Sequence, residues 1–265
     1  NNSKDSTKKK LNKYMHDPRF KIFFNEKNLE RSYSRNLGFA NATGDFVTLL
    51  DSDDKLKKNI FKEFRDFYKK NNKYNIFFSN YEIYNPLSKK IRRNSINLNT
   101  VSLNNLSNGN YLSNICVFFK NSICKKIIYD ESPDIIGIED YDFNLRVINY
   151  FGIAKKFSNL SLGIVTDHYN RSVNLDSILK SENRYSFFKN KLFYNLDFKN
   201  VSLSIKYRIL STSSLYVSLI CMKNKNKLKS IKYLYISLLN NYKILIDKRF
   251  YYIIYGVIFK LWKKF

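Results

Sequence analysis

Residues 46–54 read Phe46-Val47-Thr48-Leu49-Leu50-Asp51-Ser52-Asp53-Asp54, and this stretch decides the fold class. A mostly apolar run of five residues leads directly into three carboxylates, as expected where a buried strand ends. Open α/β sheets bind their ligands at the carboxyl ends of parallel strands. We therefore expect the three aspartates to lie at the ligand-binding edge of an α/β sheet.

The same acidic cluster predicts a cation site. Carboxylates this close repel one another and raise one another's pKa unless a cation lies among them. Oxygen ligands select Mg²⁺ or Mn²⁺, which typically join a few carboxylates to phosphate oxygens. The alternative is that Asp51–Asp54 caps the helix expected near Lys57. One carboxylate would suffice for a cap, so three favour the cation site.

Outward from this stretch, β-rich runs alternate with helical spacing, which indicates an α/β fold with a mainly parallel sheet flanked by helices. The expected strands are Phe20–Phe24, Phe46–Leu50, Asn75–Ser79, Ile115–Phe119 and Leu160–Thr166. The expected helices among them are Ser6–Met15, Leu29–Ala42 and Lys57–Lys70. Residues 85–114 are rich in Asn and Ser, which predicts a surface loop with a short helix at Ser102–Leu106.

Beyond Asn174 only helical spacing continues, so we expect two parts, an α/β domain over 1–175 and a helical segment over 176–265. The expected C-terminal helices are Leu175–Asn195, Ser202–Met222, Leu228–Asn240 and Lys248–Lys264. The second part is strongly basic, with 18 Lys or Arg against 4 Asp or Glu, a net charge of +14. A basic amphipathic segment of this kind can pack on itself or lie on an anionic membrane.

The composition of the 265-residue chain excludes several classes of protein. A hydrophobic fraction of 44% excludes intrinsic disorder, and 7 Gly with 3 Pro exclude collagen-like sequences. No apolar run reaches the roughly 18 residues of a membrane-spanning helix. The three cysteines, Cys116, Cys124 and Cys221, are odd in number and form no CxxC pair, which favours a reducing cytoplasm over a disulfide framework.

The net charge of +25 has two interpretations. Abundant Lys, Asn, Ile, Tyr and Phe are what an AT-rich genome would encode whatever the function. A nucleic-acid-binding protein is the rival interpretation. No helix-turn-helix, zinc or aromatic-platform motif supports it, so we expect no nucleic-acid partner.

The stretch from Ser34-Arg35-Asn36-Leu37-Gly38 to Asp54 resembles the signature "ARNxGxxxAxGxYxxxLDSDD" of family 2 glycosyltransferases of the GT-A fold. Residues 1–7 resemble the end of the family's "DDGSTDxT" segment, and residues 139–146 its "EDxDfxlR" helix start. His168 and the four residues after it are similar to the "HxxxS" that closes the catalytic domain. The resemblance covers about residues 1–175.

This resemblance implies a donor site that binds a nucleotide-sugar and a divalent ion, Mn²⁺ or Mg²⁺. Asp5, Arg35, Asp51 and Asp53 match positions near the nucleotide, and His168 matches the histidine that completes the metal or diphosphate site. The metal ligands implied are Asp53, Asp51 and His168. Neutralising the diphosphate makes it a better leaving group. For His16, the other histidine, we expect a packing or surface role.

The resemblance further implies that Asp140 is the general base, with Glu139 orienting or binding the acceptor. The alternative for Glu139 and Asp140 is capping of the helix that they begin. One base with in-line displacement implies inversion at the sugar carbon. The expected acceptor is a hydroxyl of a glycan or lipid-linked molecule, as in cell-surface polysaccharide biosynthesis.

The family's first strand, first helix and most of its second strand would precede Asn1, so we expect the natural protein to be about 35–45 residues longer, on the basis of one βαβ unit. Its expected location is the cytoplasm, peripherally on the inner face of the cell membrane. A relative that keeps the GT-A scaffold but only binds partners, without catalysis, remains the alternative.

Overall fold

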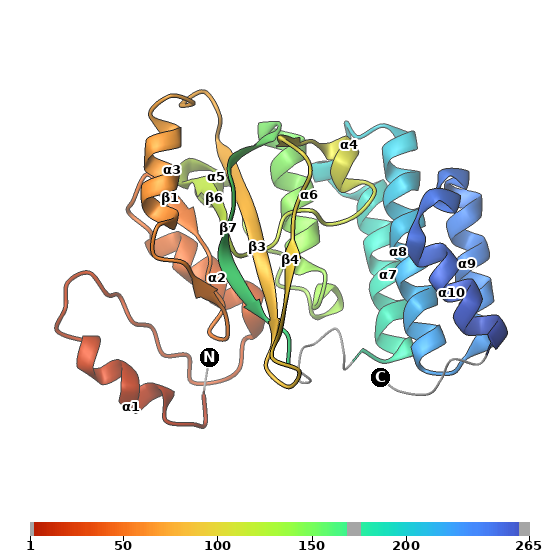
Figure 1. Cartoon of the computed structure of the whole chain (residues 1–265), viewed down its shortest axis with the longest axis horizontal. Coiled ribbons are helices and arrows are strands. Elements are labelled where there is room, and N and C mark those ends of the chain that lie inside the picture. The colour runs from red at the N-terminus through yellow and green to blue at the C-terminus, as the bar shows by residue number, and fades with distance from the viewer. Residues whose placement is uncertain (1–2, 169–175, 260–265) are drawn as a thin grey trace.

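The computed structural model describes residues 3–168 and 176–259, and Figure 1 shows a central sheet flanked by helices. The seven strands are β1 (Phe46–Thr48), β2 (Lys55–Leu56), β3 (Ile76–Asn85), β4 (Lys90–Asn94), β5 (Thr100–Val101), β6 (Val117–Lys120) and β7 (Ala154–Thr166). Their main order in space is β1-β6-β3-β7-β2, with β4 paired to β3 and β5 paired to β7. The expected α/β class is confirmed.

The sheet is mixed, so the prediction of a mainly parallel sheet is wrong. Only β3 and β7 pair in parallel, and the other five pairs of described strands are antiparallel. Strands joined through helices favour parallel pairing, but a tight turn joins β3 to β4. The Asn85 side chain forms this turn by accepting hydrogen bonds from the backbone N–H of Leu87 at 3.0 Å and of Ser88 at 2.9 Å.

The expected surface loop at 85–114 is therefore only partly correct. It contains β4, β5 and the helix α4 (Leu103–Leu106), which lies where the short helix was expected. Four of the five β4 residues are exposed, so this strand lacks the alternation that reveals a half-buried strand. The strand expected at Phe20–Phe24 does not form, because no described strand pairs with it, and its three Phe side chains are exposed.

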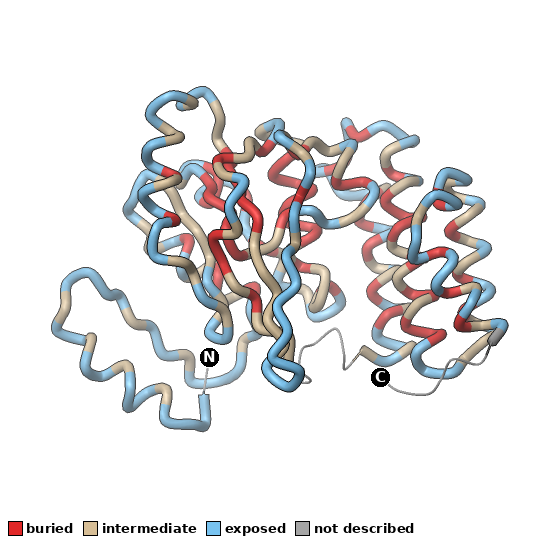
Figure 2. Tube along the Cα trace, viewed as in Figure 1, coloured by how far each residue is buried: buried red, intermediate tan, exposed pale blue. Residues whose placement is uncertain are grey.

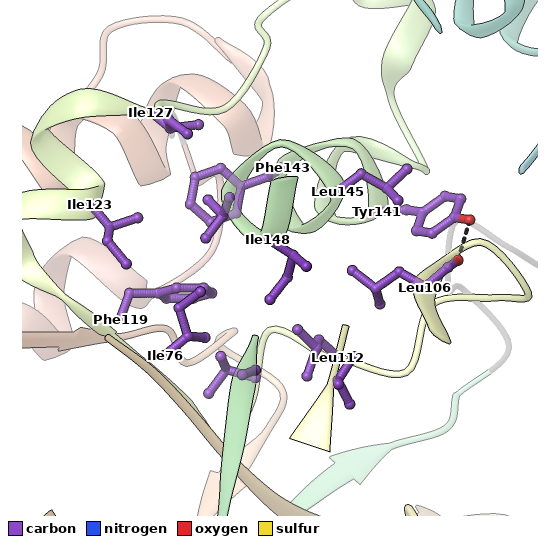
Figure 3. Close-up of a cluster of buried hydrophobic side chains, with 14 of the residues drawn as sticks. Ile76, Leu106, Leu112, Phe119, Ile123, Ile127, Tyr141, Phe143, Leu145 and Ile148 are labelled. Atoms are coloured by element: carbon purple, nitrogen blue, oxygen red, sulfur yellow. Dashed lines mark hydrogen bonds between the residues drawn. The ribbon is translucent and has the colours of Figure 1, made fainter. Parts of the chain in front are cut away.

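Helices cover both faces of the sheet. The helices of the first part are α1 (Thr7–Leu11), α2 (Glu30–Asn41), α3 (Ile60–Tyr68), α4, α5 (Asn121–Lys126) and α6 (Glu139–Phe151), with 3₁₀ turns η1 (Asn12–Tyr14) and η2 (Pro133–Ile135). Alternate residues of β3 face opposite layers. Phe77 packs with Phe64 of α3, whereas Ile76 belongs to the cluster that contains Phe143 of α6, part of which Figure 3 shows.

The C-terminal part is helical throughout its described residues, as expected. It contains α7 (Ile178–Tyr194), η4 (Leu196–Phe198), α8 (Leu203–Lys223), α9 (Lys227–Asn240), η5 (Tyr242–Ile246) and α10 (Lys248–Phe259). Among the described residues, none of these helices combines the length and apolar character needed to cross a bilayer. Of these helices, α7 and α8 stand nearest to α6, and α9 and α10 lie farther from the sheet (Figure 1).

One hydrophobic cluster joins the two parts of the chain. Phe188 and Leu192 of α7 and Ile209 of α8 are fully buried in the same cluster as Phe143 and Ile76. Figure 2 shows buried positions along the central strands and on the facing sides of the C-terminal helices. The helix α6, which begins with the predicted catalytic pair, is thus packed between the sheet and the C-terminal helices.

Two reciprocal serine pairs hold α8 against α9. The Ser211 hydroxyl donates to the Ser237 carbonyl oxygen at 2.7 Å, and the Ser237 hydroxyl donates to the Ser211 carbonyl oxygen at 2.8 Å. Ser218 and Ser230 repeat the arrangement two turns away, at 2.7 Å and 3.0 Å. All four residues are fully buried, so small side chains allow the two helices to approach closely without leaving polar groups unpaired.

Candidate active site

The acidic turn after β1 is fixed to the end of β7. The Asp54 carboxylate accepts a hydrogen bond from the backbone N–H of Thr166 at 3.0 Å, and the Thr166 hydroxyl donates to the Asp53 carbonyl oxygen. The capping interpretation of this cluster is not supported. Helix α3 begins at Ile60, its N-cap position is Asn59, and β2 lies between the acidic turn and the helix.

Asp53 and His168 lie together although they are 115 positions apart in the sequence. Asp53 Oδ2 is 2.9 Å from His168 Nε2, and both side chains are partly exposed. The two side chains therefore lie close together, as expected. The rest of the "HxxxS" motif, Tyr169 to Ser172, lies outside the described residues.

Asp51 turns instead toward Arg35. Arg35 Nη2 is 3.1 Å from Asp51 Oδ1, and its Nη1 is 3.1 Å from Glu139 Oε1. Both Arg35 and Glu139 are buried, and the Arg35 guanidinium stacks 5.1 Å from the centre of the Tyr129 ring. Arg35 thus joins the end of β1 to the start of α6, which the sequence motif did not reveal.

Asp140 lies next to this ion-pair network at the start of α6. Its Oδ1 accepts a hydrogen bond from the Tyr141 backbone N–H at 2.8 Å, and its Oδ2 accepts one from Asn110 Nδ2 at 3.1 Å. Burial, with the adjacent Glu139 charge, raises the pKa of Asp140 to about 6, against the lowering effect of Arg35. A carboxylate with such a pKa is ionised at neutral pH and still basic enough to accept a proton.

Glu139 does not serve as an ordinary helix cap. Its Oε2 accepts a hydrogen bond from the Gly137 backbone N–H at 2.6 Å, while Oε1 pairs with Arg35. The N-cap residue of α6 is Ile138, whose side chain makes no capping hydrogen bond. Glu139 therefore connects the loop before α6 to Arg35, and through it to Asp51.

Asp5 is not brought to this cluster by any contact of the described residues. Its exposed carboxylate accepts a hydrogen bond from the Thr7 backbone N–H at 3.0 Å at the start of α1. Hydrogen bonding by the Thr7 side chain, and then by its backbone, lowers the pKa of Asp5. In this arrangement the Asp5 side chain caps the start of a helix, which is an alternative role to nucleotide binding.

Of the three expected metal ligands, the structure brings two side chains together. Asp53 and His168 are in contact, whereas Asp51 pairs with Arg35. Within residues 3–168 and 176–259, no three His, Cys, Asp or Glu side chains converge as a metal-binding group. Two donors fit the chemistry of a divalent ion that takes its remaining ligands from phosphate oxygens and water.

Three residues of the site were missed in the sequence. Asn110 lies in the Asn-rich stretch 85–114, and its hydrogen bond to Asp140 brings that stretch to the start of α6. Tyr129 lies under Arg35, and Arg184 of α7 packs against Gly137, where an added Cβ would lie 2.8 Å from Arg184 Nη2. No motif marks Tyr129 or Arg184, because both act through packing with distant segments.

A hollow of about 460 Å³ lies between α2 and β1. Arg35 and Asp51 line it, together with Ser34, Gly38 and Thr48. The acidic turn forms one end of this hollow, so a phosphorylated ligand seated there would meet the guanidinium and carboxylates described above.

Comparisons with known proteins agree with this geometry. Residues 1–131 match the model of the family described as glycosyl transferase family 2. Among solved structures, the chain resembles S. aureus TarS 1–349 in complex with UDP-GlcNAc, with a TM-score of 0.53 and 16% identity over 91% of this chain and 80% of that chain. The complex of TarS 1–349 with UDP gives a TM-score of 0.52 and 16% identity over 90% and 77%.

A longer TarS structure gives a TM-score of 0.51 and 16% identity, over 90% of this chain but only 46% of that chain. At this identity the likeness shows a shared fold, which agrees with the expected GT-A arrangement. No protein of curated function matches the sequence.

Proposed function

This chain belongs, through residues 1–131, to glycosyl transferase family 2, and on that premise we propose that it transfers a sugar from a nucleotide-diphosphate sugar to a hydroxyl group, with inversion at the sugar carbon. The observation that carries the proposal is the Arg35 network. It joins the acidic turn, where the donor would lie, to the start of α6, where Asp140 lies.

The proposed donor is a nucleotide-sugar bound at the end of β1. TarS, which shares this fold, has been crystallised with UDP and with UDP-GlcNAc. The hollow between α2 and β1 ends at Asp51, and Arg35 in its wall could donate hydrogen bonds to phosphate or base. We assign Asp51 and Arg35 to this donor side of the reaction.

Asp53 and His168 would hold the divalent ion, Mn²⁺ or Mg²⁺, that the family resemblance implies. Their contact at 2.9 Å supports this assignment, because it puts a carboxylate oxygen and an imidazole nitrogen side by side. When bound, the ion neutralises charge on the diphosphate leaving group.

Asp140 is the proposed general base. It takes the proton from the acceptor hydroxyl as that oxygen forms a bond to the anomeric carbon, and the bond from this carbon to the diphosphate breaks. The electron pair of that bond leaves with the nucleoside diphosphate. Asn110 orients the Asp140 carboxylate by its hydrogen bond, and the Arg35 charge limits how far burial and the neighbouring Glu139 raise the pKa of Asp140.

Two substitutions test these assignments against each other. UDP-sugars and GDP-mannose are screened for turnover with Mn²⁺, and nucleotide binding is followed by calorimetry. Asp53→Ala should abolish metal-dependent nucleotide binding. Asp140→Asn should retain binding and slow turnover by about 10²–10⁴-fold.

The matched control is Asp134→Asn, an exposed aspartate shortly before α6, which should leave both measurements unchanged. The opposite pattern for Asp53 and Asp140 would contradict the role assignment. Nucleotide binding without turnover of any donor would favour the non-catalytic scaffold.

The outer face of α9 supports a further part of the proposal, attachment to an anionic membrane. Four exposed apolar side chains lie along one stripe of this helix, Leu228, Ile231, Tyr235 and Leu239. They recur at helical spacing, and Lys232 is exposed beside them. An apolar stripe flanked by basic residues is typical of helices that lie in the interface of anionic membranes.

A further inference from the structure

A cavity of about 350 Å³ lies beside Asp140, between the start of α6 and the C-terminal helices. The loop before α6 and the residue Asn110 form one wall. Helices α7 and α8 form the other, with Tyr185 and Phe188 from α7 and Ser213 and Tyr216 from α8. The general base proposed above therefore faces a space that the C-terminal helices enclose.

The ion-pair network connects this cavity to the donor hollow. Arg35 lines the hollow between α2 and β1, and Glu139 pairs with Arg35. The next residue, Asp140, lines the cavity. A hydroxyl in the cavity would thus lie beside the proposed base, while Arg35 and Glu139 connect that base to Asp51 on the donor side.

The charges around the cavity are balanced. Arg184 donates to both carboxylate oxygens of Asp176, at 2.9 Å and 3.0 Å, and the Tyr216 hydroxyl donates to the same carboxylate at 2.8 Å. Arg249, at the mouth of the cavity, pairs with Asp247. Both described arginines of the lining are therefore neutralised, and an anionic ligand would face the Asp140 carboxylate without a compensating cation.

The remaining lining suits a sugar ring. Aromatic rings offer a flat apolar surface to the C–H face of a sugar, and the hydroxyls of Ser213 and Tyr216 offer polar contacts at its edge. The volume is at the small end for ligand sites, which favours a single sugar unit.

A second hollow of about 600 Å³ continues from the mouth of this cavity and shares Gly109, Asn110 and Arg249 with it. Its lining is rich in amide side chains, from Asn94, Asn97, Asn105 and Asn108. Amides both donate and accept hydrogen bonds, which matches the hydroxyls of a neutral glycan. The two spaces together form a path from Asp140 outward along residues 94–111.

We infer that the cavity between α6, α7 and α8 is the acceptor subsite, that it takes the terminal unit of a neutral glycan, and that the hollow lined by asparagines holds the following units. This inference rests on the proposed function. It gives the helical C-terminal segment a direct part in acceptor selection, independent of any contact with a membrane.

The test measures binding of neutral sugars to the full chain by saturation-transfer NMR. The probes are the methyl glycosides of glucose, galactose, mannose and N-acetylglucosamine, with glycerol 1-phosphate as the anionic probe. Ser213→Phe fills the cavity from α8, and Asn110→Phe obstructs its exposed mouth, so a folding defect in one variant leaves the other informative. Ser204→Phe, on an exposed position of α8, is the matched control.

We expect at least one methyl glycoside to bind the natural chain and Ser204→Phe, and to bind Ser213→Phe and Asn110→Phe at least tenfold more weakly. Undiminished glycoside binding in every folded cavity variant would overturn the inference. Binding of glycerol 1-phosphate alone, or of no probe, would overturn it as well. Affinity for UDP and turnover of UDP-GlcNAc, measured separately, report on the proposed function, so the two ideas can fail independently.

Discussion

Arg35 shows how much a single buried cation organises in this protein. Its guanidinium contacts Asp51 and Glu139 at 3.1 Å each and stacks on Tyr129. The Asp51 side chain is 40% exposed, whereas that of Glu139 is 6% exposed. Loss of Arg35 would therefore leave the buried Glu139 carboxylate without a counter-ion, which costs far more than the loss of a partner for Asp51. Arg35 is therefore a positioning residue for the start of α6, in addition to the donor contact proposed for it.

The pKa of Asp140 leads to a prediction about pH. Because burial raises it to about 6, the carboxylate is protonated below that value and cannot accept the acceptor's proton. We expect kcat/KM for transfer to rise with pH through this region. A pH–rate profile from pH 5 to 8 checks this, with Asp134→Asn as the control. A flat acid limb would contradict the assignment of Asp140 as the base.

The same shift has a consequence for stability, whose sign follows from linkage. A carboxyl group whose pKa is raised on folding stabilises the fold while it is protonated, and this contribution is lost as pH rises through the folded pKa. Asp140→Asn removes this ionisable group. The melting temperature of the variant, relative to that of the natural chain, should therefore be higher at pH 8 than at pH 5. Thermal unfolding at both pH values measures the difference.

At the residue scale, the sequence could predict several of the side chains that gather but not how they pair. The motif resemblance led to Asp53 with His168, which the structure brings into contact. It also grouped Asp51 with them, whereas the structure pairs Asp51 with Arg35. The carboxylate partners of the Arg35 guanidinium depend on the relative placement of α2, β1 and α6. No local sequence pattern encodes that placement.

At the scale of elements, helices were predicted better than strands. Each long amphipathic helix presents a periodic apolar face, and α7, α8, α9 and the described part of α10 lie within a few residues of their expected ranges. Strand direction failed because it depends on the connection. The Asn85 turn reverses the chain into β4, and β6 runs antiparallel to both of its neighbours.

The serine pairs between α8 and α9 support a prediction about packing. Ser211→Leu introduces bulk where two helices are in close contact and should lower the free energy of unfolding by about 1–3 kcal/mol or more. Ser211→Ala should cost about 1 kcal/mol or less, because the Ser237 hydroxyl keeps its bond to the backbone carbonyl of residue 211. Urea denaturation compares the two variants.

Ser204→Leu provides the control for that experiment, since Ser204 is an exposed residue of the same helix. If Ser211→Leu were no less stable than Ser204→Leu, the close approach of α8 and α9 would not depend on small residues at this position.

At the scale of the whole molecule, the chain was predicted to consist of a catalytic part and a basic helical part. The described strands all lie before residue 169, and the described residues from 176 onward contain only helices and the loops between them. The shared core was not foreseeable. Periodicity shows that α7 has an apolar face but cannot show that Phe188 and Leu192 face the same cluster as Phe143.

The basic, partly apolar surface leads to a prediction about membranes. In flotation with vesicles of phosphatidylcholine and phosphatidylglycerol, the natural chain should float with the lipid. The double variant Leu228→Glu with Leu239→Glu should bind at least about tenfold less, because it puts charge into the apolar stripe of α9. Vesicles of phosphatidylcholine alone should bind weakly.

Leu87→Glu with Ile91→Glu is the matched control, since both residues are exposed on the β3–β4 hairpin. This double variant should float like the natural chain. Equal flotation of the α9 variant and the control would eliminate α9 as the membrane-binding face.

The cluster that unites α6 with α7 and α8 also constrains how the protein matures during synthesis. Phe143 is translated well before Phe188, Leu192 and Ile209, yet it is packed in one cluster with them. A nascent chain that has emerged only through α6 therefore exposes apolar surface and has an unfinished reaction centre. Activity should appear only after α8 has left the ribosome. Until then, chaperones would bind the exposed apolar surface of the nascent chain.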